Sequence, residues 1–204
     1  MNRPPIFRSS PIFTAVKRCV DIAAALVGLA VVSPVLAICA WLIWRADGGS
    51  PLFCQWRVGC DGKLFQLYKL RTMRRDAERF GVRFAATGDA RVLPLCTWMR
   101  RSHVDELPQL LNVLLGHMSL VGPRPERPEV MEQLRMELPR FEWRLAAAPG
   151  LTGLAQVRNG YSSDLRGMRR KLALDLQYLQ RRSIAYDLLL LVRTVPKLWD
   201  RAAC

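Results

Sequence analysis

The residues that could do chemistry gather in residues 102–129, where the sequence reads SHVDELPQLLNVLLGHMSLVGPRPERPE. Asp105 and Glu106 are adjacent carboxylates, followed by Leu107-Pro108 and a short apolar run. Proline is favoured in the first turn of a helix, and Gly116 is a typical stop, so a helix is predicted to begin beside the pair. The carboxylates would then lie near exposed backbone N–H groups. N-terminal capping by the aspartate is the structural alternative.

Adjacent residues at the start of a helix point in different directions, so the two carboxylates can have different roles. One can attack a substrate while the other binds a cation. Mg²⁺ takes oxygen ligands and commonly bridges a carboxylate to substrate phosphates. An aspartate that attacks a pyrophosphate would form an acyl phosphate, a recognised form of covalent catalysis. Arg124 lies between two prolines on a stiff turn, and its guanidinium can bind a phosphate bidentately. These residues favour Mg²⁺-dependent chemistry on a phosphorylated substrate, with helix capping as the competing explanation.

The composition indicates an anionic partner. The 204 residues include 31 Lys+Arg against 17 Asp+Glu, a formal charge of +14, and half of all residues are hydrophobic. Nucleic acid, anionic lipid and phosphorylated substrates all fit this charge. We expect no nucleic acid partner, because no binding motif is recognisable and the basic residues are scattered. Six cysteines without a CxxC pair favour reduced thiols facing the cytoplasm over a zinc site or a disulfide framework.

A long apolar segment near the N-terminus suggests a membrane. From Ile22 to Trp44 the chain carries no charge for 23 residues, which is long enough to cross a bilayer. Ser33-Pro34 interrupts this run, and a proline inside a helix causes a bend or a break. A kinked spanning helix and a re-entrant hairpin both remain open. Positive charge at both ends, from Lys17-Arg18 and from Arg45, favours the hairpin with both ends cytoplasmic.

The rest of the chain predicts small strands and amphipathic helices. Asp61-Gly62 between two mixed apolar and polar runs predicts a β-hairpin, and Lys69 and Arg71 come at the end of its second strand. Residues 184–198 place leucines between arginines and aromatic residues, which suits an interfacial helix, with a core helix nearly as suitable. The other predicted segments are an amphipathic helix at 130–140, a loop with a short strand at 146–160, and a basic helix at 168–179.

These elements predict an α+β, mainly helical fold in three parts. Residues 1–16 would form a basic N-terminal tail. Residues 17–46 would form a re-entrant membrane helix broken at Ser33-Pro34. Residues 47–204 would form a compact, membrane-associated cytoplasmic catalytic domain, with the small β-hairpin and interfacial amphipathic helices.

Taken together, the motifs resemble the small monotopic phosphoglycosyl transferases, a bacterial sugar transferase family. The resemblance covers about residues 17–195, and the motifs that carry it are KRCVD, Ser33-Pro34, RVGCDGKLFQLYKLRTM, DELPQLLNVL, MSLVGPRPE, PGLTGLAQV and KLALDLQYL. It implies transfer of a sugar-1-phosphate from a nucleotide diphosphate-sugar, with UDP favoured, to polyprenol phosphate. This would be the first membrane step of exopolysaccharide, capsule, O-antigen or glycoprotein glycan assembly at the bacterial inner membrane.

The resemblance also implies individual roles. Asp105 would be the nucleophile of a ping-pong reaction through an aspartyl phospho-sugar, and Glu106, with Asp105, would bind Mg²⁺. Ser33-Pro34 would hold the re-entrant turn in one leaflet, with the catalytic domain on the cytoplasmic face. We expect no multi-spanning N-terminal domain of the kind that larger relatives carry. The substrate-binding positions implied are Arg100, Pro123, Arg124, Pro125, Lys69 and Arg71.

Some positions depart from the family pattern. His103-Val104 and His117 stand where other residue types are common, and Leu93-Pro94 and Cys96-Thr97 replace pairs that often contain arginine. The two lost arginines put a substrate contact at those positions in doubt, and we expect an active enzyme with an altered sugar preference. Two other functions compete: a membrane-anchored basic nucleic-acid-binding module and a Mg²⁺-dependent nucleotide-sugar pyrophosphatase. A homo-oligomer stays open.

Overall fold

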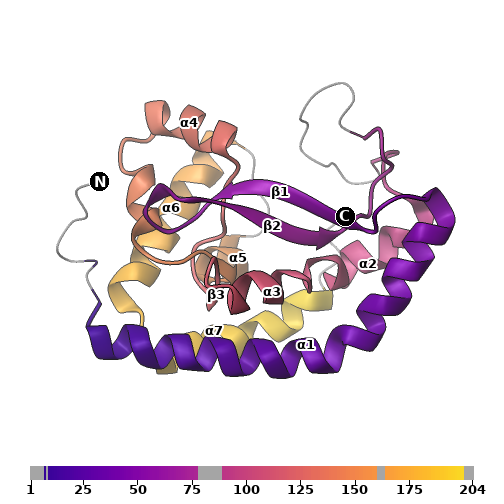
Figure 1. Cartoon of the computed structure of the whole chain (residues 1–204). Coiled ribbons are helices and arrows are strands. Elements are labelled where there is room, and N and C mark those ends of the chain that lie inside the picture. Colours follow the sequence, from indigo (N-terminus) through magenta and orange to yellow (C-terminus); the bar gives the residue numbers. More distant parts are fainter. Residues whose placement is uncertain (1–6, 8, 78–88, 160–163, 200–204) are drawn as a thin grey trace.

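The protein is mainly helical, with two small two-stranded sheets (Figure 1). A computed structural model describes residues 7, 9–77, 89–159 and 164–199. The predicted mainly helical α+β class is confirmed. After the first helix the elements are, in chain order, β1 (Leu52–Val58), η2 (Cys60–Gly62), β2 (Leu64–Leu70), η3 (Pro94–Cys96), α2 (Thr97–Arg101), η4 (Val104–Glu106), α3 (Gln109–Leu114), β3 (Ser119–Val121), α4 (Pro128–Glu137), η5 (Phe141–Ala146), β4 (Gly150–Thr152), α5 (Leu154–Asn159), α6 (Leu165–Arg181), α7 (Ile184–Thr194) and η6 (Val195–Trp199).

The first helix, α1 (Pro11–Asp47), is continuous rather than broken at Ser33-Pro34. It bends in its second half (Figure 1), because Pro34 removes one donor without interrupting the rest of the hydrogen-bond ladder. The Ser33 hydroxyl donates to the Ala30 carbonyl at 3.1 Å, an acceptor one turn back. The helix also begins earlier than the predicted start at residue 17, since Ser10 caps it by accepting from the Phe13 N–H.

Helix α1 is the one described helix that is long and apolar enough to cross a membrane. Only four of its described side chains are buried. Large apolar side chains instead remain exposed along much of its length, with Val31 71% and Trp41 57% accessible. A helix that is apolar on nearly every side, yet this little covered by protein, leaves a continuous apolar surface for another partner.

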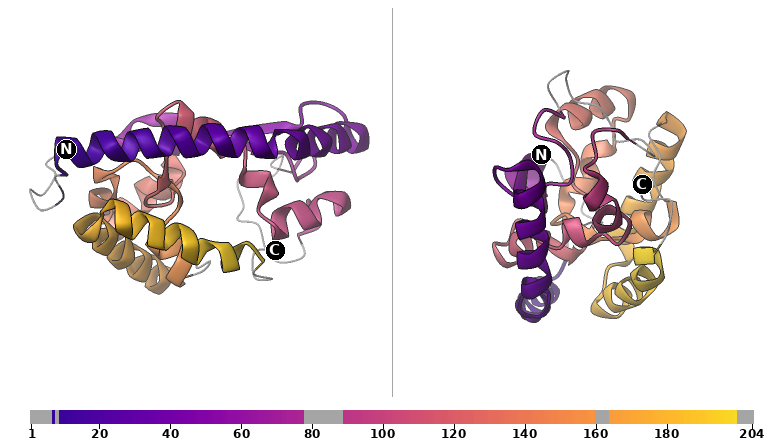
Figure 2. Two further views of the ribbon diagram at one scale, coloured as in Figure 1. Left: turned by 90° about the horizontal axis from the view of Figure 1, so that it is seen from below. Right: turned by 90° about the vertical axis from the view of Figure 1, so that its right-hand side faces the viewer.

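Three side chains of the KRCVD motif tie α1 to the rest of the fold. The Lys17 ammonium lies 2.5 Å from the Asp187 carboxylate of α7. Arg18 donates to two carbonyls in the last turn of α3, at 2.5 and 2.7 Å. The Asp21 carboxylate accepts from the Leu120 N–H of β3 at 3.0 Å. Helices α1 and α7 run along the same side of the molecule (Figure 2).

The predicted β-hairpin is confirmed. Strands β1 and β2 pair antiparallel over their full length, and the turn between them contains Asp61 at φ 56° and Gly62 at φ 78°. Such left-handed backbone is tolerated best by Gly, Asn and Asp. Strand β2 packs against α3, with Asn112 donating to the Gln66 carbonyl and accepting from the Tyr68 N–H.

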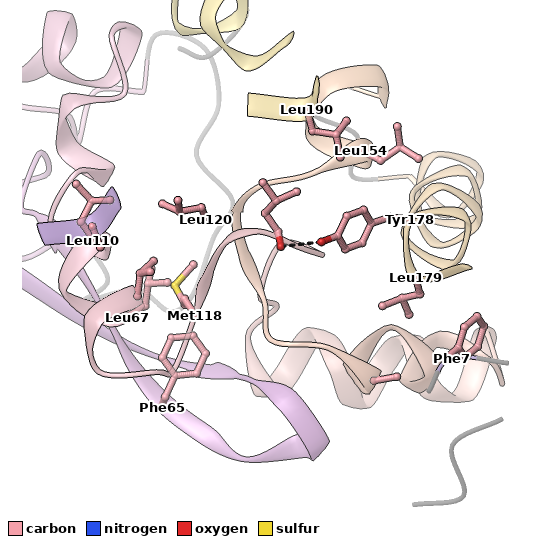
Figure 3. Packing of buried hydrophobic residues seen from close by; sticks show 14 residues of the cluster. Phe7, Phe65, Leu67, Leu110, Met118, Leu120, Leu154, Tyr178, Leu179 and Leu190 are labelled. Atoms are coloured by element: carbon pink, nitrogen blue, oxygen red, sulfur yellow. Dashed lines mark hydrogen bonds between the residues drawn. The ribbon is translucent and has the colours of Figure 1, made fainter. Parts of the chain in front are cut away.

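The second sheet pairs β3 parallel to β4, and it leads directly into the Pro-Arg-Pro segment. A side chain at Gly150 would place its Cβ 2.0 Å from the backbone nitrogen of Gly122, so only glycine fits this crossing. The main core packs around this sheet (Figure 3). Within it, the Tyr178 hydroxyl of α6 donates to the Val121 carbonyl at 3.0 Å.

The predicted helices near residues 130–140, 168–179 and 184–198 are confirmed as α4, α6 and α7. The short strand expected within residues 146–160 is β4, but the end of that segment forms α5 instead of a loop. Helix α7 buries Leu190 while it exposes Leu188 and Val192. One of its faces therefore packs on the core and the other presents apolar side chains outward.

Candidate active site

Asp105 and Glu106 lie in η4, a short turn of its own between α2 and α3. His103 enters this turn with φ 55°, a left-handed conformation that reverses the chain after α2. The predicted helix is confirmed as α3, but its N-cap is Pro108. The alternative in which the aspartate caps this helix is therefore wrong, because the separate turn moves the carboxylates away from the first turn of α3.

Two cationic side chains bind the Glu106 carboxylate. Arg124 binds it bidentately, with Nη1 3.1 Å from Oε2 and Nη2 2.6 Å from Oε1. Lys69 Nζ lies 2.7 Å from the same Oε1. Burial alone would raise the pKa of Glu106, but Arg124 and Lys69 outweigh it and hold that pKa well below its usual range. Glu106 is therefore a carboxylate held in its ionised form by two cations.

Asp105 is the opposite case. It is as buried as Glu106, but in the described part of the chain its carboxylate accepts no hydrogen bond and forms no ion pair. Burial, and next the negative charge of Glu106, raise the pKa of Asp105 to about 6, while Lys69, Arg100 and Arg124 act the other way. The pair thus combines a fixed anion with an uncommitted carboxylate, which suits a base or a nucleophile.

The other predicted substrate-binding residues divide into two groups. Lys69, Arg100 and Arg124 all influence the charge of Asp105, so the structure brings them to the pair. Arg100 also donates to the Thr72 hydroxyl at 3.3 Å. Arg71 lies elsewhere, at the end of α1, where it donates to the Gly48 carbonyl and stands 3.5 Å from the Asp47 carboxylate. Its side chain joins the hairpin to α1.

The segment around Pro123, Arg124 and Pro125 is held through its carbonyl oxygens. Prolines lack an N–H, so this backbone cannot pair as an ordinary strand. Four consecutive carbonyls, from Pro123 to Glu126, instead accept from donors on other elements. In order, the donors are Gly150 N at 2.9 Å, Arg144 Nη2 at 2.7 Å, Arg57 Nη1 at 3.1 Å and Val58 N at 2.9 Å.

Behind this segment lies a second ionic cluster, for which the sequence predicted no role. Arg144 is 2% exposed. It lies 2.8 Å from the Asp175 carboxylate and 3.3 Å from that of Glu126, which also binds Lys171. Lys171 and Arg144 outweigh burial and lower the pKa of Glu126 to about 2. The signal for this cluster was the KLALDLQYL motif, whose charges stand on the inner face of α6.

The carboxylate pair also fits a Mg²⁺ ion bound together with a substrate. No group of three or more His, Cys, Asp or Glu side chains that could hold a metal occurs among the described residues. Mg²⁺ commonly needs only one or two carboxylates when substrate phosphates complete its shell. Asp105 has no protein partner in the described part, and three contacts on Glu106 leave about one of a carboxylate's four lone-pair positions.

The positions that depart from the family pattern have structural roles. Leu93 and Cys96 are buried and pack with Cys39 and Ile43 of α1. These two side chains join the bent helix to the segment before α2, whereas Pro94 is exposed and Thr97 is half-buried. His117 lies against Phe65, with ring centroids 5.7 Å apart.

A family model described as bacterial sugar transferase matches residues 12–201. The chain belongs to this family of enzymes. A relative from Aeromonas hydrophila, named UDP-N-acetylgalactosamine-undecaprenyl-phosphate N-acetylgalactosaminephosphotransferase, is 39% identical over 91% of this chain. A relative from Caulobacter vibrioides, named UDP-glucose:undecaprenyl-phosphate glucose-1-phosphate transferase, is 42% identical over 89% of this chain.

A third relative, from Bacillus subtilis, is 47% identical over 66% of this chain and is named a putative undecaprenyl-phosphate N-acetylgalactosaminyl 1-phosphate transferase. This sugar transferase spans different shares of these proteins: 44% of the Aeromonas protein, 69% of the Caulobacter protein and 75% of the Bacillus protein. The names carry different sugars but the same lipid, undecaprenyl phosphate.

Proposed function

We propose that this sugar transferase moves a sugar-1-phosphate from a nucleotide diphosphate-sugar, with UDP as the nucleotide, to a polyprenol phosphate. The observation that carries the proposal is the division of roles in the carboxylate pair, where Glu106 is committed to two cations and Asp105 is not. The names of the relatives supply the substrate classes. The product would enter exopolysaccharide, capsule, O-antigen or glycoprotein glycan assembly.

The reaction has two halves in this proposal. An Asp105 oxygen attacks the phosphorus that carries the sugar, and the bond from that phosphorus to the oxygen of the nucleoside phosphate breaks. Nucleoside monophosphate leaves, and the sugar phosphate stays on Asp105 as an acyl phosphate. A phosphate oxygen of the polyprenol phosphate then attacks the same phosphorus, which yields a polyprenyl diphosphate-sugar and restores the Asp105 carboxylate.

Glu106, Lys69 and Arg124 prepare the site for these steps. Together they form a hydrogen-bonded group that is in place before the substrate arrives, so little reorganisation is needed during the reaction. Arg124 and Lys69 oppose the negative charge that two phosphates bring. Mg²⁺, held by Glu106 and Asp105, would further neutralise that charge when bound.

For the membrane, we propose that α1 enters and leaves one leaflet on the cytoplasmic face of the bacterial inner membrane, with its bend at Ser33-Pro34. The exposed apolar side chains of α1 support contact with hydrocarbon. Helix α7 would lie at the interface, because Leu188 and Val192 point outward beside Arg193. The carboxylate pair follows Val104, which packs against the core cluster that contains Cys39 and Ile43 of α1, and it would then meet a soluble donor and a lipid acceptor.

Release of nucleoside monophosphate from a UDP-sugar, with and without polyprenol phosphate and Mg²⁺, tests this function. We expect sustained release only with the lipid, and a covalent phospho-sugar on the wild-type chain that Asp105→Asn lacks. Asp61→Asn, in the remote hairpin turn, is the matched control and should turn over normally. Full activity of Asp105→Asn would refute the proposed nucleophile.

The competing functions give other results in the same preparation. Sustained hydrolysis to free sugar phosphate without any lipid would identify a pyrophosphatase. A basic nucleic-acid-binding module would instead show duplex DNA affinity that falls steeply with salt.

A further inference from the structure

Arg57, in β1, was given no role by the sequence, and its surroundings are unusual for an inward-facing arginine. Nη1 donates to the Pro125 carbonyl at 3.1 Å, and Nη2 donates to the Gln55 amide oxygen at 2.6 Å. Both acceptors are neutral. These bonds use two of the five N–H donors of a guanidinium. Its Nε is buried without an acceptor, and no described carboxylate lies within ion-pair distance of it.

The carboxylates nearest to Arg57 are already committed to other cations. Glu106 is bound by Lys69 and Arg124, and Glu126 is bound by Lys171 and Arg144. Burial, and next the positive charge of Arg124, lower the pKa of Arg57 to about 10, and Arg127 acts in the same direction. Glu126 and Glu106 act the other way on this pKa, but neither carboxylate is within ion-pair distance of the Arg57 guanidinium.

Arg144 shows how the same fold treats an arginine with a structural role. Two carboxylates contact it directly, at 2.8 and 3.3 Å. Although burial alone would lower the pKa of Arg144, Asp175 and Glu126 raise it. A desolvated charge is costly unless it is paired. Arg57 is desolvated but has no carboxylate partner among the described residues. A bound anionic ligand would supply the partner that the protein does not provide.

We propose that Arg57 is a substrate-binding residue that donates to a phosphate group in the site, beside Arg124. This inference rests on the proposed function and extends it, because it assigns a further phosphate contact. The position of Arg57 supports this proposal. Arg57 donates to the carbonyl of Pro125, the residue that follows Arg124, and Arg124 binds Glu106. Guanidinium groups bind phosphate oxygens through paired N–H donors. The phosphate could belong to the nucleotide sugar or to the lipid acceptor.

Binding measurements on the full chain in detergent test the proposed phosphate contact of Arg57. Every protein in this experiment carries Asp105→Asn, which prevents turnover. The probes are inorganic pyrophosphate, UDP-glucose and undecaprenyl phosphate. We expect Arg57→Gln to weaken the binding of at least one probe about 10- to 100-fold, as for hydrogen bonds to charged groups. Arg57→Lys should recover part of the loss, because it keeps the charge. Arg135→Gln, which removes an exposed arginine, should stay within about twofold.

The probes separate the two sources of phosphate. A loss for pyrophosphate and UDP-glucose places Arg57 on the donor, whereas a loss for undecaprenyl phosphate alone places it on the acceptor. Unchanged binding of all three probes would overturn the inference. A loss that Arg57→Lys does not relieve, accompanied by a lower melting temperature, would overturn it too, because it would show a structural role. If pyrophosphate binding depends on Arg57 but the wild-type chain never releases nucleotide, the proposed function fails while this inference stands.

Discussion

Two ionic clusters flank the Pro-Arg-Pro segment, and they are built differently. In the inner cluster, Arg144 and Lys171 balance Glu126 and Asp175, and each carboxylate has a cation. In the outer cluster, Arg124 and Lys69 both bind Glu106, and Asp105 beside it receives neither a hydrogen bond nor an ion pair from the described residues. The carboxylates of both clusters are buried, so burial does not separate them.

The difference shows where the fold uses charge for stability and where it keeps charge for chemistry. A fully paired buried cluster fixes its elements, because loss of one partner leaves an uncompensated charge. The outer cluster uses its two cations on one carboxylate and so leaves the other available. The inner cluster holds the Arg124 carbonyl through Arg144, and in this way it supports the outer one.

The largest expected effect separates the two aspartates. Asp105→Asn should reduce turnover at least ~10³-fold, as loss of a nucleophile does, without lowering the melting temperature. Asp175→Asn should cost ~3–5 kcal/mol of stability, because it removes a partner of buried Arg144. Turnover assays and denaturation of both variants check this. An Asp105→Asn protein as unstable as Asp175→Asn would remove the distinction.

The next prediction concerns pH. If Asp105 attacks as an anion with a pKa of about 6, kcat/KM should fall through an acid limb with a midpoint near that pH. Below it, the rate should drop about tenfold per pH unit. A pH profile at constant ionic strength measures this. An acid limb with its midpoint near the ordinary pKa of an aspartate would show that the pKa of Asp105 is not raised during the reaction.

Glu106→Gln should shift the acid limb of the remaining activity to lower pH. The change removes the negative charge that raises the pKa of Asp105, and it frees Lys69 and Arg124 to stabilise the Asp105 anion. The measurement is the pH profile of the variant beside that of Glu132→Gln, an exposed control. An unmoved limb in Glu106→Gln would indicate that the two carboxylates do not interact.

A smaller effect is expected in stability. The pKa of Asp105 lies above its ordinary 3.8, so the folded state binds a proton more readily between roughly pH 4 and 6. Stability of the wild type relative to Asp105→Asn should therefore fall as pH rises through this window, and stay level on either side. Melting temperatures of both proteins across the window check this. A difference that rises with pH would reverse the assigned sign.

The smallest expected effect is the loss of stability on removing an exposed arginine, which serves as a control for both buried clusters. Arg135 is about half exposed and pairs with Glu132 and Glu142 on the surface. Arg135→Met should change stability by no more than ~0.5 kcal/mol, whereas Arg144→Met should cost several times more. Denaturation of the two variants side by side tests whether burial and pairing decide the size of the effect.

The sequence by itself determined the elements whose signals are local. Asp61-Gly62 marks the hairpin turn, the uncharged run marks α1, and Pro108 with Gly116 brackets α3. Each depends on backbone preferences and contacts within a few residues. The motifs also located the carboxylate pair and the Pro-Arg-Pro segment before any contact was known.

Only the tertiary structure decided how these parts share charge. Glu106 meets Lys69 across 37 positions of the chain and Arg124 across 18, and Arg144 meets Asp175 across 31. No periodicity encodes such pairings, so the sequence left unassigned which carboxylate is held and which stays free. The protonation of Asp105 follows from burial and neighbouring charge, which exist only after the chain has folded.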